Sequence, residues 1–163
     1  MSTETLSAAL EREHREIDGG IEEYAAGLEA GAEPDHDAAD PAPLRRAMEG
    51  LRRHIYLEEE FIFPPLKASG LMMPVFVMLR EHGELWDAMS GLDDLLATGA
   101  NASVIQTACQ DLLLRLDAHN SKEEPVIYPQ ADAQLSDEAT ARLHDFLADG
   151  RMPDGWKCEK ATR

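Results

Sequence analysis

The chain has 163 residues, of which 32 are acidic and 15 are basic, so its formal net charge is −17. This balance argues against nucleic acid and anionic membranes as partners, because both are bound through clustered Lys and Arg. No apolar run approaches the ~18 residues of a membrane-spanning helix, and no basic start precedes an apolar signal segment. We therefore expect a soluble, cytoplasmic protein.

The first predicted helix runs from about Thr3 to Leu28, where apolar residues recur at the spacing of one helical face. His14 falls on that face. The next segment, residues 29–43, is rich in Gly, Ala, Asp and Pro and predicts a loop. His36 lies in this loop, and we expect it to be solvated.

The second predicted helix begins near Pro41 and ends at Pro64, because proline suits the first turn of a helix but cannot continue its interior. His54 and Glu58 both lie on its apolar face, four residues apart and therefore one turn above each other. The third helix is expected over residues 71–97 and carries His82 on its apolar face.

A short turn leads to the fourth helix, which Asn101 or Ser103 is expected to cap. His119 and Glu123 repeat the four-residue spacing on the apolar face of this helix. A short fifth helix is predicted over residues 136–148. It holds His144, which we expect to lie apart from the other helical histidines.

The predicted organisation is one domain over residues 1–150, followed by an irregular tail over residues 151–163 in which Trp156 lies over the bundle. Four long amphipathic helices with short connections pack most simply as an all-α, up-down-up-down four-helix bundle. The two cysteines do not suggest a disulfide framework. Cys109 lies in an apolar helical pattern and is expected in the core, whereas Cys158 lies in the polar tail.

An internal repeat organises the chain. The segment from His54 to Pro64 returns as the segment from His119 to Pro129, with matched His, Glu, Ile, aromatic and Pro positions. A second pair of matching segments is Glu13-His14, which precedes the first copy, and Glu81-His82, which precedes the second. The chain therefore consists of two copies of one unit, each with a lone His followed by a His-x-x-x-Glu pair.

Six side chains of these two units are expected to face one apolar interior: His14, His54, Glu58, His82, His119 and Glu123. A buried ionised carboxylate without a partner costs roughly several kcal/mol, and metal ions would supply the missing positive charge. Neutral imidazole and carboxylate suit iron, zinc or manganese. Six ligands exceed the three or four that one zinc takes and match two ions, each bound by two His, with both Glu bridging.

Each part of this pattern has a simpler explanation when taken alone. A single His on an apolar face is more often a satisfied core residue, and one His-x-x-x-Glu pair is a common contact on a helix surface. The matched pairs and the matched lone histidines together favour the metal interpretation. Glu59 and Glu124 point about 100° away from their neighbours, which predicts solvated or supporting roles.

The chain resembles the hemerythrin-like family of HHE cation-binding domains over roughly residues 5–148. The resemblance rests on the six residues in this order and on the Glu-Glu-x-x-Ile-aromatic-Pro motif that continues each His-x-x-x-Glu pair. The resemblance implies a four-helix bundle around a non-haem diiron centre, with two iron ions and an oxo or hydroxo bridge. The family includes O₂ carriers, O₂ or redox sensors, iron-sensing domains, and diiron proteins linked to nitric oxide stress or iron–sulfur repair.

The chain departs from the O₂-carrying members in two places. Their third helix carries His-x-x-x-His, whereas Trp86 stands four residues after His82. Their fourth helix carries Asp five residues after its His, where this chain has Glu124. The five-His site of the O₂ carriers is therefore not expected. In some members a tyrosine joins the metal; the candidates here, none of which is assigned, are Tyr24, Tyr56 and Tyr128.

Open positions on two adjacent redox metals predict the binding or processing of a small ligand, namely O₂, NO or H₂O₂. Turnover of peroxide or NO would make the protein an oxidoreductase with an electron donor as partner. The alternative is an iron- or oxygen-responsive binding or sensor module without turnover. A ferritin-like carboxylate oxidase is less favoured, because its motif is Glu-x-x-His with Glu predominating. Nothing in the pattern requires an oligomer.

Overall fold

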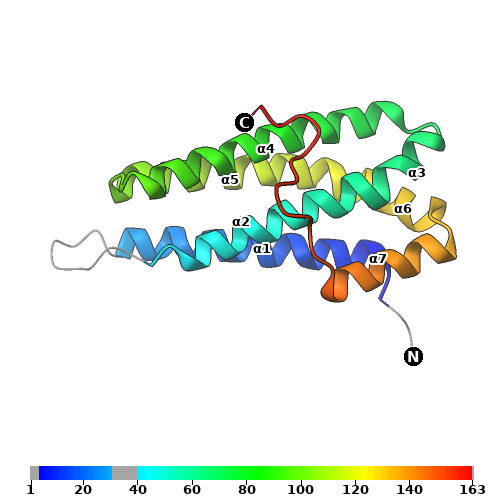
Figure 1. Ribbon diagram of the computed structural model, residues 1–163, viewed down its shortest axis with the longest axis horizontal. Helices are drawn as coiled ribbons and strands as arrows, with labels where there is room; N and C mark the ends of the chain where they lie inside the picture. Colours follow the sequence, from blue (N-terminus) through cyan, green and yellow to red (C-terminus); the bar gives the residue numbers. More distant parts are fainter. Residues whose placement is uncertain (1–3, 31–39, 163) are drawn as a thin grey trace.

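The computed structural model describes residues 4–30 and 40–162, and within these ranges it is helical and contains no strand. The four long helices are α1 (Leu6–Ala30), α2 (Ala42–Leu57), α4 (Met72–Ala97) and α5 (Ala102–Lys122). Helix α1 packs against α2 and α5, and α4 packs against α5 and α2, so the four helices share one interior (Figure 1). None of the described helices is long and apolar enough to cross a membrane. His36 lies outside the described residues.

Helices α2 and α5 do not end at their His-x-x-x-Glu pairs. Each runs into a π-helical turn and continues as a further α segment: η1 (Glu58–Ile62) leads to α3 (Phe63–Ala68), and η2 (Glu123–Ile127) leads to α6 (Tyr128–Gln134). The prediction that Pro64 ends the second helix is therefore wrong. Pro64 lies in the first turn of α3, where the missing N–H of a proline is tolerated.

The interior consists of two apolar clusters separated by a polar layer. His14 marks the boundary on α1, because Leu10 belongs to one cluster and Ile17 to the other. His82 has the same position on α4. The cluster nearer the α1–α2 connection includes Ile21, Met48, Leu51, Met89, Leu112 and Leu116, and the other includes Leu57, Ile62, Leu66, Val75, Ile127 and Leu143. Burying these side chains provides the main stabilisation of the fold.

Two helix starts are capped by side chains, and the first of these caps was predicted. The Asn101 side chain accepts a hydrogen bond from the Val104 N–H at 3.1 Å, which caps α5. Ser136 caps α7 (Asp137–Asp149) by accepting a hydrogen bond from the Ala139 N–H at 3.1 Å. Each cap satisfies an N–H that has no partner within its helix.

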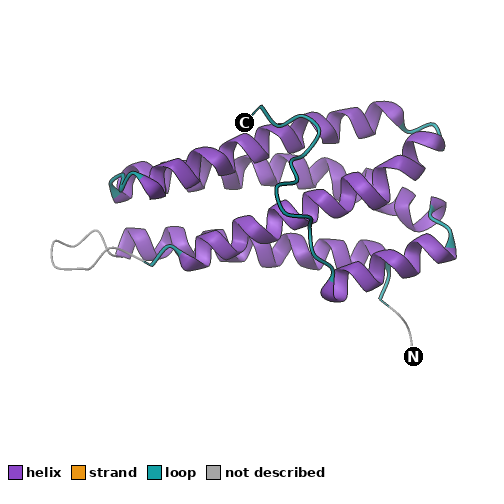
Figure 2. Ribbon diagram, in the orientation of Figure 1, coloured by secondary structure: helices purple, strands orange, loops and turns teal. Residues whose placement is uncertain are grey.

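Beyond α7 the chain forms a tail without regular structure, which crosses α2 and ends beside α4 (Figures 1 and 2). Trp156 lies over the bundle as predicted, with its ring 5.1 Å from that of Tyr56 and 5.5 Å from that of Trp86. Cys109 is buried in the core, also as predicted. Cys158 is buried too, although it lies in a polar stretch of sequence, because the tail packs against the same cluster.

Candidate metal centre

The six residues singled out in the sequence meet in the polar layer between the apolar clusters, and none is more than 4% exposed. They form two groups whose ligand atoms lie within 4.8 Å of one another and could hold a metal ion. We name these groups after their histidines as the His14–His54 subsite and the His82–His119 subsite. Glu58 and Glu123 belong to both.

Glu58 and Glu123 each turn one oxygen toward each subsite. In the His14–His54 subsite, Glu123 Oε1 lies 3.3 Å from His14 Nε2, and Glu58 Oε2 lies 3.6 Å from His54 Nε2. The second oxygens, Glu58 Oε1 and Glu123 Oε2, lie 3.2 Å and 3.3 Å from Nε2 of His82 and His119, respectively. Two carboxylates placed in this way can bridge a pair of adjacent cations.

A seventh side chain, Tyr128, lies in the His14–His54 subsite. Its Oη atom is 2.7 Å from His14 Nε2 and 3.0 Å from His54 Nε2. The same atom is 3.0 Å from Glu58 Oε2 and 2.9 Å from Glu123 Oε1. One hydroxyl offers a single donor and two lone pairs, so it cannot satisfy all four partners. The concentration of ligand atoms around Oη fits a position beside a cation.

The π-helical turn η2 explains why Tyr128 is not singled out by helical spacing. In a regular α-helix, a residue five positions after Glu123 would point about 140° away from it. In η2 the Tyr128 N–H donates to the Glu123 carbonyl oxygen, and this i to i+5 bond brings Tyr128 back over Glu123. The turn η1 places Phe63 in the same way, stacked on His82 with the ring centroids 5.3 Å apart. In both repeats an aromatic residue stands five positions after the Glu, and this match was the sequence signal that could have pointed to Tyr128.

A glutamate lies beside the Nδ1 atom of each imidazole. The four pairs are Glu13 with His54 at 2.8 Å, Glu59 with His82 at 2.7 Å, Glu81 with His119 at 2.9 Å, and Glu124 with His14 at 3.5 Å. We call these glutamates the outer ring. The first three distances are hydrogen bonds that leave Nε2 facing inward, as in carboxylate–histidine–metal arrangements, and the fourth is a longer contact.

The outer ring was predicted only in part. Glu59 and Glu124 follow their neighbours Glu58 and Glu123 in the sequence. Glu59 has the supporting role considered for it, whereas Glu124 is 32% exposed and makes only a 3.5 Å contact with His14. The other two members precede a histidine in the sequence but contact a histidine on a different helix. Spacing along one helix does not reveal a partner that depends on how two helices pack.

The carboxylates of the site raise the pKa values of three imidazoles, those of His54, His82 and His119. Burial lowers the pKa of His54, but the charge of Glu58 and the hydrogen bond to Glu13 outweigh it and raise the pKa to about 10. Burial likewise lowers the pKa of His119, but the charge of Glu123 outweighs it and raises the pKa to about 10. Burial alone would raise the pKa of Glu123, yet the facing imidazoles bring it well below its ordinary value. Without a cation, His54 and His119 therefore pair as imidazolium ions with these carboxylates.

Three buried polar atoms of the His82–His119 subsite have no hydrogen-bond partner. They are Glu58 Oε1, His82 Nε2 and Glu123 Oε2. An unsatisfied buried polar atom costs about 1–3 kcal/mol, so three such atoms in one place call for a common partner. A cation between them would satisfy all three, so the donor set of this subsite fits a metal ion.

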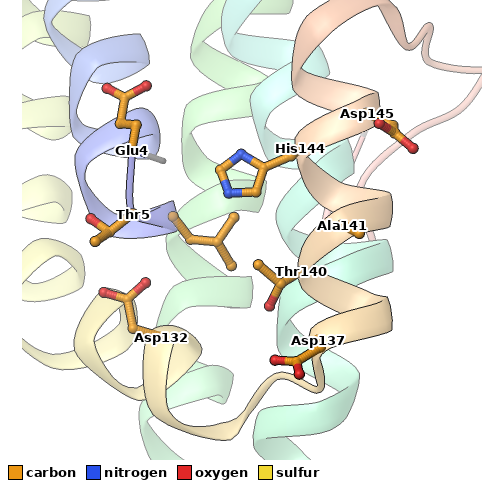
Figure 3. A pocket seen from close by; sticks show the side chains of 9 residues that line it. Glu4, Thr5, Asp132, Asp137, Thr140, Ala141, His144 and Asp145 are labelled. Carbon is orange, nitrogen blue, oxygen red and sulfur yellow. The ribbon is translucent and has the colours of Figure 1, made fainter. Parts of the chain in front are cut away.

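His144 lies apart from the six residues, as predicted. It lines a cavity of about 600 Å³ near the start of α1. Figure 3 shows its imidazole pointing into this cavity from α7, with Asp132 of α6 and Glu4 on the opposite wall. None of the six clustered residues lines this cavity. The cavity is therefore separate from the candidate metal centre.

The helices and their buried His–Glu cluster define an all-helical metal-binding module. Residues 5–131 match the model of the hemerythrin HHE cation-binding domain, and the chain belongs to this family. The matched segment contains all six clustered residues, whereas α7 and the tail lie beyond it. No curated protein and no solved structure matches the chain.

Proposed function

We propose that the chain is a non-haem diiron protein, built as an up-down-up-down four-helix bundle, that binds or processes O₂, NO or H₂O₂. The proposed ligands are His14, His54, Glu58, His82, His119 and Glu123. The observation that carries the proposal is that both glutamates direct one oxygen to each subsite. These two carboxylates would hold two adjacent iron ions, and an oxo or hydroxo bridge between the ions is part of the proposal.

The two proposed ions have unequal surroundings. Tyr128 Oη is a candidate fifth protein ligand in the His14–His54 subsite, because it lies within 3.0 Å of both imidazole Nε2 atoms. In the other subsite the equivalent side chain is Phe63, which has no ligand atom and stacks on His82. We therefore assign the small ligand to the His82–His119 subsite, where fewer protein groups compete for the metal.

Burial of the site limits what can react there. The bound irons would supply one-electron chemistry and open coordination positions. The chain keeps bulk water away from them, because the clustered side chains are nearly inaccessible and apolar clusters lie on both sides. Three glutamates of the outer ring accept hydrogen bonds from Nδ1 of His54, His82 and His119 and so fix the orientation of these imidazoles. These conditions favour a diatomic ligand or a peroxide over a larger organic substrate.

The metal content of four variants tests the assignment of the ligands. Glu58→Ala and Glu123→Ala should each lose at least one metal equivalent and the visible absorption of a bridged pair, because a bridge serves both ions. His14→Ala and His82→Ala remove one terminal ligand, which water can replace, and should retain more metal. His144→Ala serves as the control and should match the parent. If both Glu variants keep two irons and the parental spectrum, the carboxylates are not bridges.

Turnover separates the oxidoreductase from the iron- or oxygen-responsive module. The iron-loaded protein, supplied with a chemical reductant, would be challenged with excess NO or H₂O₂ while the ligand is followed with an electrode. Continuous consumption would identify an oxidoreductase. Uptake that stops at one ligand per iron pair would identify a binding or sensor module.

A further inference from the structure

The C-terminal tail contacts the outer ring beside His82. The Glu159 backbone N–H donates to Glu59 Oε1 at 3.0 Å, while Glu59 Oε2 accepts from His82 Nδ1 at 2.7 Å. One carboxylate thus joins the tail to a proposed metal ligand. The tail lies beyond the family-matched segment, so this connection is additional to the repeat that builds the site.

Glu59 differs from two other members of the outer ring in how its second oxygen is held. Glu81, which contacts His119, forms an ion pair with Lys122 of α5. Glu13, which contacts His54, pairs with Arg53 of α2 at 3.2 Å. Those partners are side chains of the long helices themselves. The partner of Glu59 is a backbone N–H of the tail, whose position depends on how the tail docks.

Three features fix the tail at this place. The Thr162 N–H and hydroxyl donate to the Asp87 carboxylate at 3.0 Å and 2.6 Å. Cys158 is 4% exposed and packs in the core cluster. The tail backbone also approaches α4 closely at Gly83, where an added Cβ would lie 2.5 Å from the Lys160 carbonyl oxygen. A side chain at position 83 therefore requires the docked tail to shift away from α4.

The docked tail also covers the outer side of the His82–His119 subsite. A cavity of about 180 Å³ lies between α3 and the tail, with Phe63 and Glu59 on one side and Trp156 and Glu159 on the other. Glu59 is 6% exposed at its side chain in this arrangement. Lifting the tail would remove one hydrogen bond from Glu59 and expose its carboxylate to water.

We propose that the tail positions His82 for metal binding through Glu59, so that the His82–His119 subsite holds its metal firmly only when the tail is docked. This inference rests on the proposed function. In carboxylate–histidine–metal arrangements, loss of the outer partner reduces metal affinity roughly 10–100-fold. The His14–His54 subsite should depend much less on the tail, since its outer glutamates are Glu13 and Glu124.

The test compares Gly83→Ala with Gly91→Ala in the full chain. Both substitutions place Ala in α4, where it favours the helix, but an added Cβ at Gly91 meets nothing within 4 Å. The iron-loaded proteins are mixed with excess chelator, and metal release is followed in time. The parent and Gly91→Ala should release both equivalents slowly. Gly83→Ala should release one equivalent at least about tenfold faster and the other at the parental rate.

A fluorescence signal and further variants make the result decisive. Displacement of the tail is measured by a change in Trp fluorescence, since Trp156 packs on Trp86. If Gly83→Ala leaves this signal unchanged, Gly83→Leu is used with Gly91→Leu as its control, because no small shift can accommodate the larger side chain. Glu59→Ala should by itself produce the fast equivalent. Combining it with Gly83→Ala should add no further acceleration, because both act through the same carboxylate.

The outcomes separate the two proposals. A displaced tail with parental release kinetics would overturn the positioning role. Equal acceleration of both equivalents, or additive effects in the double variant, would also overturn it, because either indicates general destabilisation. A parent protein that binds no pair of metal ions would overturn the proposed function and the inference with it.

Discussion

Tyr128 and Phe63 hold equivalent places in the two repeats and differ by one hydroxyl group. The hydroxyl of Tyr128 lies among two imidazoles and two carboxylates, whereas the ring of Phe63 stacks on His82. Burial and the carboxylates raise the pKa of Tyr128 well above its ordinary value, so the phenol keeps its proton unless a cation replaces it. The repeat therefore produces two subsites of different chemistry from one shared motif.

Replacing Tyr128 by Phe tests this difference. We expect Tyr128→Phe to fold normally, because Phe63 shows that the equivalent position accepts the smaller side chain. If Oη binds iron, the iron-loaded variant should lose phenolate-to-iron absorption, and metal should leave one subsite roughly ten times faster. Absorption spectra and chelator kinetics measure both effects. Tyr24→Phe, which changes a tyrosine of the apolar cluster, is the control. An unchanged spectrum in Tyr128→Phe would mean that its hydroxyl is not a ligand.

At the scale of residues, the repeat was sufficient to predict which six side chains come together. Each of the six lies on an apolar face at regular helical spacing, and that spacing is visible in one helix at a time. Tyr128 depends on a π-helical turn, and Glu13 and Glu81 depend on the packing of neighbouring helices. These features arise from tertiary structure, which helical periodicity does not encode.

At the scale of elements, Arg53 connects α7 to the candidate site. Its guanidinium donates to the carbonyl oxygens of Phe146, Leu147 and Gly150 at the end of α7, where carbonyl groups run out of partners within the helix. The Phe146 carbonyl also accepts from the Gly150 N–H at 2.7 Å. The guanidinium also lies 4.8 Å from the ring of Phe146. The same group pairs with Glu13, which contacts His54. One side chain thus ends a helix and supports the outer ring.

Arg53→Met is expected to loosen the end of α7. Because hydrogen bonds to a charged group contribute about 1.5–3 kcal/mol, the unfolding free energy should fall by about 2 kcal/mol. Amide hydrogen exchange over residues 146–150 should increase. Arg52→Met is the matched control, since Arg52 pairs with Asp93 and lies over Trp86. Equal exchange in the two variants would show that Arg53 does not hold α7.

At the scale of the whole molecule, the long helices were predicted because their apolar stripes are continuous. The continuation of two helices past Pro64 and Pro129 was not predicted, because proline was expected to end each helix. A π turn precedes each proline and places it in the first turn of a new α segment, where proline is tolerated. Burial of the tail was also only partly foreseen. Its sequence is polar, and its docking depends on single contacts such as the close approach at Gly83. Single close contacts of this kind produce no periodic pattern in the sequence from which docking of the tail could be predicted.

The stability of the metal-free protein should depend on pH with a definite sign. The pKa values of His54 and His119 are raised to about 10 in the fold, above the ~6.5 of an unfolded imidazole. Their contribution to stability is therefore complete below pH ~6.5 and is lost as the pH rises toward 10. Metal binding requires neutral imidazoles, so the metal-loaded protein does not lose this contribution.

The difference in melting temperature between loaded and chelated protein should therefore widen between pH 7 and pH 9. Scanning calorimetry of both forms at the two pH values measures it. His144→Ala should show the same widening, because His144 lies outside the site. A difference that narrows with rising pH would contradict the ion pairing described for the metal-free site.

The outer ring also bears on the reduction potential of any redox metal bound inside it. A carboxylate that accepts the Nδ1 proton of an imidazole makes Nε2 a more basic donor. Three imidazoles of this site have such a hydrogen bond, and the two inner carboxylates add further negative charge. All of these groups stabilise the more highly charged state of a metal. Iron held here would give up an electron readily and would require a strongly reducing donor to regain it.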